Sequence, residues 1–163
     1  MRITIVGAGF SGSALASELA RQAGPGVELC LVGVADSYGR GVAYGEARPE
    51  HLLNVRASDL GATPDQPGGF ADWLNLTDRA RGSYLPRLLY GEYLHAQLQT
   101  AVAGSTAGFS QIRHEAIAVD ERLLHRLDKA VVIRRAPVGA VVQPQSRKCS
   151  HDLQRRHALR WRR

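Results

Sequence analysis

The sequence predicts an α/β protein in which helices flank a parallel sheet, and three features of its first 32 residues support that fold class. Residues 2–6 form an Ile- and Val-rich run, which is typical of a short strand buried on both faces. From residue 11 to residue 23, small and apolar residues recur at helical spacing, and the sequence GPG at 24–26 ends this helix. Residues 27–32 then predict a second strand. The order strand, turn, helix, strand is half of a doubly wound sheet with a right-handed crossover.

The remaining elements are predicted from composition and spacing. Residues 33–69 are rich in Gly, Pro, Asp and Asn, which indicates a long loop with short pieces of structure. Loops of this length are usually functional or disordered. A short helix is expected over 70–76, and a strand over 111–119. Pro86 opens a longer helix. One side of that helix is expected to carry Leu89, Tyr93, Leu94, Leu98 and Val102.

Length and composition are those of a single globular domain. The chain has 163 residues, of which 44% are hydrophobic and 22% charged, so it is long enough to bury a core. No apolar stretch reaches the length of a membrane span, and the first residues lack the pattern of a secretory signal. The two cysteines form no C-x-x-C motif, and Cys30 lies in an apolar run that predicts burial. We therefore expect a cytoplasmic protein without membrane contact.

The charge is divided sharply along the chain. Residues 1–121 carry a net charge of −4, whereas residues 122–163 carry +10. We interpret 1–120 as the N-terminal part of a nucleotide-binding domain and 121–163 as a basic, irregular tail. Three accounts of the tail stay open: a diverged or frame-shifted end of a truncated gene, a basic arm for nucleic acid in which Trp161 stacks, or a disordered terminus. We rank the first account highest.

The sequence GAGFSG between the first strand and the first helix has the spacing of a dinucleotide-binding turn. Gly7 would permit the tight turn, Gly9 would let the backbone approach a pyrophosphate, and Gly12 would let the helix pack on the strand. The helix that follows directs free N–H groups and a partial positive charge toward the phosphates. The alternative is that the three glycines serve only the strand–helix junction. The flanking strand and helix favour the binding function.

The acidic residue that usually contacts the ribose is missing from its usual place. Gly33 stands at the end of the second strand, where a carboxylate is expected. Asp36, three residues later, would either substitute for it or be a solvated turn residue. Arg40 nearby is also compatible with a ribose 2′-phosphate and hence NADP, which we rank lower.

Four further stretches narrow the cofactor class. They are GRGVAYG at 39–45, HLLNV at 51–55, FADWL at 70–74 and YLPRLLYGEYL at 84–94. Together with VGAGFSG, in this order and spacing, they resemble the FAD/NAD(P)-binding domain family of bacterial flavoprotein-like oxidoreductases. The resemblance covers about residues 2–120.

The resemblance implies a Rossmann-like fold that binds FAD, with NAD(P)H as a candidate reductant and an unidentified small molecule as substrate. It places the three glycines at the pyrophosphate, the loop 39–54 along the flavin side, and Arg87 facing the site. No metal site is expected, and no catalytic residue is assigned. The predicted cofactor-binding residues are Gly7, Gly9, Phe10, Ser11, Gly12, Asp36, Arg40, Asn54 and Arg87.

Several residues in these stretches also have interpretations that do not depend on the family. Arg40 would pair with phosphate or be solvated. Asn54 is expected to be half-buried and to need hydrogen-bond partners. His51 is either an acid–base group or, more commonly for a lone His beside Glu50, a surface residue. Tyr90 is interpreted, like the next tyrosine of its helix, as a packing residue.

The sequence after residue 120 lacks two parts that the resemblance implies. These are a later strand that ends in an ATG-like turn and closes the FAD site, and a second glycine-rich turn for NAD(P)H. The stretch AVVIRRAPVG at 130–139 stands where the closing strand is expected, but Arg134 and Arg135 occupy positions where small residues are expected. The sequence therefore predicts an incomplete oxidoreductase. A dinucleotide-binding protein without catalysis is the runner-up, and a small basic nucleic-acid-binding protein is third.

Overall fold

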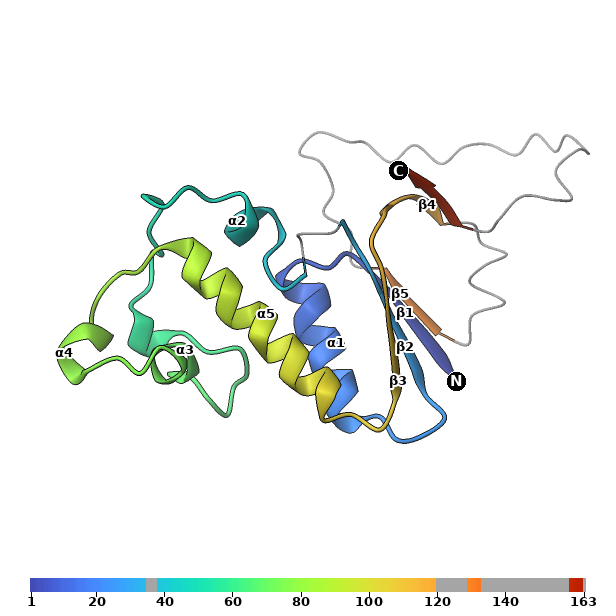
Figure 1. Ribbon diagram of the computed structural model, residues 1–163, viewed down its shortest axis with the longest axis horizontal. Helices are drawn as coiled ribbons and strands as arrows, with labels where there is room; N and C mark the ends of the chain where they lie inside the picture. The colour runs from blue at the N-terminus through green and yellow to red at the C-terminus, as the bar shows by residue number, and fades with distance from the viewer. Residues whose placement is uncertain (35–37, 120–128, 133–158, 163) are drawn as a thin grey trace, which may run out of the picture.

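Four parallel strands form the main sheet of the protein. The computed structural model describes residues 1–34, 38–119, 129–132 and 159–162 (Figure 1). The strands lie in the order β3-β2-β1-β5. Their bounds are Arg2–Val6 for β1, Glu28–Val32 for β2, Gly108–Ile112 for β3 and Lys129–Val132 for β5. The chain moves outward from β1 through β2 to β3, and β5 then pairs with the opposite side of β1. This is a Rossmann-like α/β fold, and it confirms the predicted fold class.

Burial on both faces explains why β1 and β2 are almost entirely apolar. Ile3, Ile5, Leu29 and Leu31 belong to one core cluster. The residues that alternate with them, Thr4, Cys30 and Val32, are buried as well. A strand of a parallel sheet is typically covered on both faces, so it needs apolar residues at successive positions. The predicted burial of Cys30 is confirmed.

Two long helices cover one face of the sheet (Figure 1). They are α1, Phe10–Gln22, and α5, Arg87–Ala103. The buried side of α1 is made of small residues: Gly12, Ser13, Ala16, Ser17 and Ala20. Small side chains let the helix backbone come close to its neighbours, and the Ser17 hydroxyl is satisfied by donating to the Ser13 carbonyl at 2.8 Å.

A second core cluster lies between α5 and two short elements, a 3-10 turn at Ala57–Asp59 and α3 at Gly69–Trp73. Another short helix, α4 at Asp78–Arg81, contributes no residue to it. Phe70, Tyr90 and Tyr93 form its centre, with Phe70 edge-on to Tyr90 at 5.2 Å between ring centroids. The Tyr90 hydroxyl donates to the Gly61 carbonyl at 2.9 Å, and the Tyr93 hydroxyl accepts the Ala62 N–H at 3.1 Å. Both tyrosines are therefore packing residues, as expected.

Two local predictions are wrong. Leu89 is 36% exposed, and the buried face of α5 runs through Tyr90 instead, because the aromatic cluster lies on that side. The strand expected at 111–119 is divided into β3 and β4, Glu115–Val119. Pairing of Gly108 with Glu28 sets the register of β3 on β2, and the chain leaves the sheet after Ile112. β4 then pairs in antiparallel fashion with β6, Leu159–Arg162.

β5 occupies the place where the sequence put a closing strand. It pairs in parallel with β1, with Ile5 opposite Val131. Arg134 and Arg135 lie outside the described residues. The division into a domain at 1–120 and a tail at 121–163 stays a prediction.

Replacing Leu98 with Ala should destabilise the fold far more than the same change at Leu89. Leu98 is 1% exposed and Leu89 is 36% exposed on the same helix. Truncation of a fully buried leucine to alanine lowers the free energy of unfolding by about 2–5 kcal/mol. Chemical denaturation of both variants measures the difference, and equal losses would contradict the assigned core.

Replacing Tyr90 with Phe should make the protein less sensitive to alkaline pH. Burial raises the pKa of Tyr90 from 10.0 to about 12, with smaller effects from Tyr44 and Tyr93. The fold thus favours the protonated phenol, so this contribution to stability is complete below pH 10 and declines as pH rises from about 10 through 12. The free energy of unfolding, measured by denaturation at successive pH values in that range, should therefore decline less steeply with pH for Tyr90→Phe than for the native chain. An unchanged slope would show that Tyr90 does not govern it.

Candidate functional site

The turn between β1 and α1 contains three glycines with three different local environments. Gly7 has φ +107°, a conformation that L side chains rarely adopt, and its N–H donates to the Val32 carbonyl at 2.8 Å. A Cβ on Gly12 would overlap the carbonyl oxygen of Gly7. A Cβ on Gly9 would meet, among the described residues, only ordinary contact with Gly41 Cα at 3.5 Å, and its φ is −72°. Backbone angle explains Gly7 and crowding explains Gly12, whereas neither requires glycine at position 9.

The amino end of α1 offers backbone donors that no other described residue accepts. Gly9 is the N-cap and provides no side-chain cap, and the first helical hydrogen bond is from Ser13 N–H to the Gly9 carbonyl at 2.9 Å. Within the described part of the chain, the N–H groups of Phe10, Ser11 and Gly12 have no acceptor. Phe10 and Ser11 are exposed. Free N–H groups and the positive end of the helix dipole make this end of α1 suited to an anion.

The strand order puts this turn at a topological switch point of the sheet. β2 lies on one side of β1 and β5 on the other, so the order in which successive strands are added changes sides at β1, although all the strands run parallel. In open parallel sheets, ligands bind outside the carboxyl ends of the strands at such a point. The glycine turn follows the carboxyl end of β1 directly.

A short loop, Tyr38–Gly41, packs against the glycine turn. The Gly39 N–H donates to the Ser13 hydroxyl at 2.8 Å and to the Ala8 carbonyl at 3.0 Å. A Cβ on Gly41 would stand 2.9 Å from Gly9 Cα, so the two backbones approach closely. The loop continues into α2, Gly41–Gly45. The stretch GRGVAYG is thereby brought next to GAGFSG, although Gly39 comes 30 positions after Gly9 in the sequence.

Residues 4–143 match a protein family described as FAD-NAD(P)-binding. The chain belongs to this family. The match covers most of the chain, and it agrees with the resemblance drawn from the sequence motifs. A flavin or nicotinamide dinucleotide is therefore its cofactor, and this FAD-NAD(P)-binding chain is a dinucleotide-binding protein. Comparison with curated proteins gives no match.

The residues of the FAD-NAD(P)-binding chain fit such a cofactor at its phosphate end. Gly9 leaves room for a close approach to the backbone, and α1 supplies unpaired N–H groups. Arg40 adds a guanidinium in the neighbouring loop, where its Nη2 donates to Glu92 Oε2 at 2.7 Å. The buried Nε of Arg40 has no partner among the described residues. The unpaired Nε of Arg40 and the unpaired backbone N–H groups of α1 are both donors that an anionic group would satisfy.

At the end of β2 the described chain offers no carboxylate for a ribose. Gly33 continues the ladder there by donating its N–H to the Ile112 carbonyl at 3.0 Å. Asp36, the candidate replacement, lies outside the described residues, so its role stays a prediction. Tyr38, which sequence reasoning missed, closes this edge by donating to the Ile112 carbonyl at 3.0 Å. Burial raises the pKa of its phenol above the ordinary value of 10.0, so the group stays a donor to a more alkaline pH than an exposed tyrosine would.

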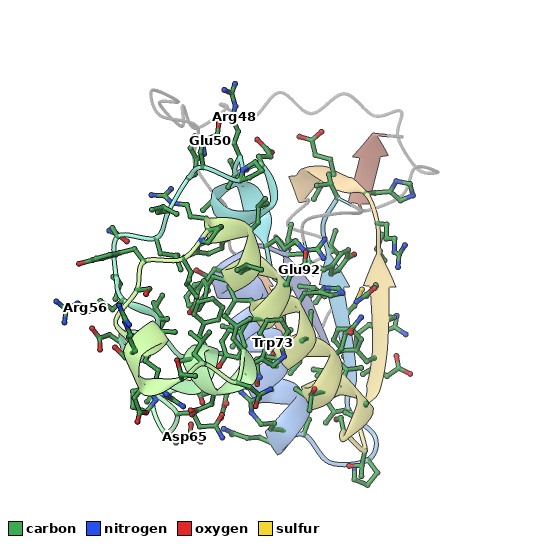
Figure 2. All side chains as sticks on the ribbon, turned by 60° about the vertical axis from the view of Figure 1, so that its left-hand side comes forward. Arg48, Glu50, Arg56, Asp65, Trp73 and Glu92 are labelled. Atoms are coloured by element: carbon green, nitrogen blue, oxygen red, sulfur yellow. The ribbon has the colours of Figure 1, made fainter. Side chains whose placement is uncertain are left out.

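The loop 51–54 gives mixed outcomes. Asn54 is exposed, so the expected half-buried position is wrong: Leu53 takes the inward position, and its N–H bonds to the Leu85 carbonyl at 2.8 Å. His51 is exposed, and its Nδ1 accepts the Arg48 N–H at 3.2 Å. Figure 2 shows Arg48 and Glu50 projecting outward from this part of the chain. The geometry agrees with a surface position for His51.

Arg87 holds this loop to α5. Its Nε donates to the Leu52 carbonyl at 3.1 Å, and its backbone N–H donates to the His51 carbonyl at 2.9 Å. A contact of Arg87 with the cofactor stays a prediction. Glu92, Ser13 and His95 were not singled out from the sequence, because their partners are distant in the chain. Only the position of Ser13 directly after GxGxxG gave a local signal.

The described residues contain neither a metal-binding cluster nor a membrane-spanning helix. No group of three or more His, Cys, Asp or Glu side chains there is arranged to hold a metal ion. No helix among the described residues is both long enough and apolar enough to cross a bilayer.

Gly12→Ala should destabilise the protein, because its methyl group would overlap the Gly7 carbonyl. Overpacking at such a site costs about 1–3 kcal/mol or more. Gly24→Ala is the matched control, since a Cβ at Gly24 meets nothing within 4 Å among the described residues. Thermal unfolding of the two variants checks this: a Gly12→Ala protein as stable as Gly24→Ala would show that α1 does not lie this close to β1.

Proposed function

We propose that the chain binds FAD at the turn after β1 and serves as the cofactor-binding part of an oxidoreductase that uses NAD(P)H as reductant. The observation that supports this most directly is the environment of Gly9. Its neighbours and its backbone angles would accept a side chain, so the glycine is better explained by a ligand that needs the space.

The proposed contacts follow from the geometry of the turn. The N–H groups of Phe10, Ser11 and Gly12 would donate to the pyrophosphate, and Arg40 would supply a charged donor from the adjoining loop. Asp36 would contact the ribose. Asn54, whose side chain is exposed, would contact the flavin side of the cofactor, and Arg87 would reach the same side from the start of α5.

Bound flavin would supply the electron-transfer chemistry, and the protein would bind and orient it. Among this chain's residues, the free end of α1 and Arg40 would neutralise the phosphate charge. The substrate is proposed to be a small molecule that reaches the exposed flavin side. The proposed binding domain is residues 1–120, and residues 121–163 form a separate tail. The proposed location of the protein is the cytoplasm.

Reconstitution of the purified chain with FAD should give a yellow protein whose visible absorption is bleached by NADH or NADPH under anaerobic conditions. The bleaching follows from reduction of the bound flavin. FAD binding without bleaching would support a non-catalytic dinucleotide-binding protein instead. A protein that retains no FAD but binds NAD(P)H would contradict the flavin assignment, and one that retains neither would contradict the site.

Gly9→Ala should weaken FAD binding at least tenfold while leaving thermal stability close to that of the native chain. The added methyl group stands in ordinary contact with its described neighbours but occupies the space against which a pyrophosphate would lie. Equilibrium titration with FAD, beside a melting curve of the unliganded variant, separates the two effects. Unchanged affinity for FAD would contradict the assigned pyrophosphate position.

A further inference from the structure

Arg40 uses only half of its hydrogen-bonding fork in this structure. Its side chain is 27% exposed, and Nη2 donates to Glu92 Oε2 at 2.7 Å. The neighbouring Nε is buried and has no partner among the described residues. Glu92 lies on α5 (Figure 2), and its side chain is 51% exposed. The pair is therefore a partly solvated contact that leaves one donor of the guanidinium unsatisfied.

Another arginine of the chain shows how a carboxylate satisfies this fork fully. Arg2 donates both Nε, at 2.9 Å, and Nη2, at 2.5 Å, to Glu28 Oε2. Arginine commonly presents these two donors together to one anionic group. A buried guanidinium N–H without an acceptor is unfavourable, because its hydration has been lost without replacement. Arg40 thus lacks the second hydrogen bond, from Nε, that Arg2 makes.

The backbone of Arg40 is held next to the free end of α1. Gly39 is bonded to Ala8 and Ser13, and Gly41 packs against Gly9. α5 secures the same loop one turn after Glu92, where His95 Nδ1 bonds to the Tyr38 carbonyl at 2.9 Å. A carbonyl only accepts, so Nδ1 carries the proton. These bonds hold the backbone of the loop in place. The side chain of Arg40, which stands between Gly39 and Gly41 in the sequence, is long enough to exchange one hydrogen-bond acceptor for another.

We propose that Glu92 is an internal stand-in for the cofactor phosphate, and that ligand binding transfers Arg40 from the Glu92 carboxylate to a phosphate group at the amino end of α1. The proposal rests on the proposed binding site and adds a residue that sets its affinity. A phosphate offers several oxygens, so it would satisfy Nε and Nη2 together. Release of Glu92 is inexpensive, since half of its side chain is already exposed. The Nε is covered in the present arrangement, so the exchange moves the arginine side chain.

Because Glu92 competes with phosphate for Arg40, Glu92→Gln should tighten binding of FAD and of ADP by roughly two- to fivefold, the range that a partly exposed ion pair supports. The substitution preserves the size of the side chain and removes its charge. Glu28→Gln is the matched control, because it removes the charge of the carboxylate that pairs with Arg2. Glu28 begins β2, so it lies at the opposite end of the strands from the glycine turn. Equilibrium titration of the full chain measures both, with melting curves to confirm folding.

The gain must also depend on Arg40. In an Arg40→Gln background, Glu92→Gln should change the affinity for FAD and ADP by less than the error of the measurement. A folded Glu92→Gln protein with unchanged or weaker affinity, or a gain that persists without Arg40, would overturn the stand-in role while leaving the proposed site intact. If the native chain itself binds neither FAD nor ADP, the proposed function fails, and the role of Glu92 fails with it.

Discussion

The close contact between Gly12 of α1 and the Gly7 carbonyl at the end of β1 is the constraint on which the rest of the site depends. It exists because position 12 has no side chain. The contact lowers α1 onto the sheet, so that its small-residue face packs among Ile5, Leu31 and their neighbours. It also fixes where the helix begins, and hence where its free N–H groups point. A bulkier residue there would change packing and electrostatics together.

Ser13 extends this junction to a third segment. Its hydroxyl donates to the Ala8 carbonyl at 2.9 Å and accepts the N–H of Gly39 at 2.8 Å. Both bonds are buried, so each is stronger in effect than it would be in water. One hydroxyl therefore joins the glycine turn to the loop that carries Arg40. α5 holds the other side of that loop through His95, which explains how a five-residue helix such as α2 can be positioned beside the turn.

The sequence predicted the features that depend on neighbouring residues. Residues 2–32 show apolar strands and a helix bounded by glycine and proline, and β1, α1 and β2 lie within one residue of the expected positions. Features set by distant partners were not predictable. The division of 111–119 depends on the pairing of Gly108 with Glu28, and the burial of Tyr90 in place of Leu89 depends on Phe70 and Gly61. Asn54 was misjudged because two leucines before it do not reveal which side of the loop faces inward.

The same limit applies to the site, and it has a physical consequence. Arg40 was a candidate from its place between two glycines, but Glu92 lies 52 residues away and enters only through the fold. At the phosphate end, the described chain provides α1 and Arg40, whereas at the end of β2 Gly33 provides only backbone. In the proposed site, α1 and Arg40 would therefore hold the phosphates, and Asn54 and Arg87 would be the described contacts on the flavin side. Since phosphate attraction is electrostatic and largely indifferent to the attached groups, the identity of the dinucleotide must be decided by contacts to its ring systems and ribose.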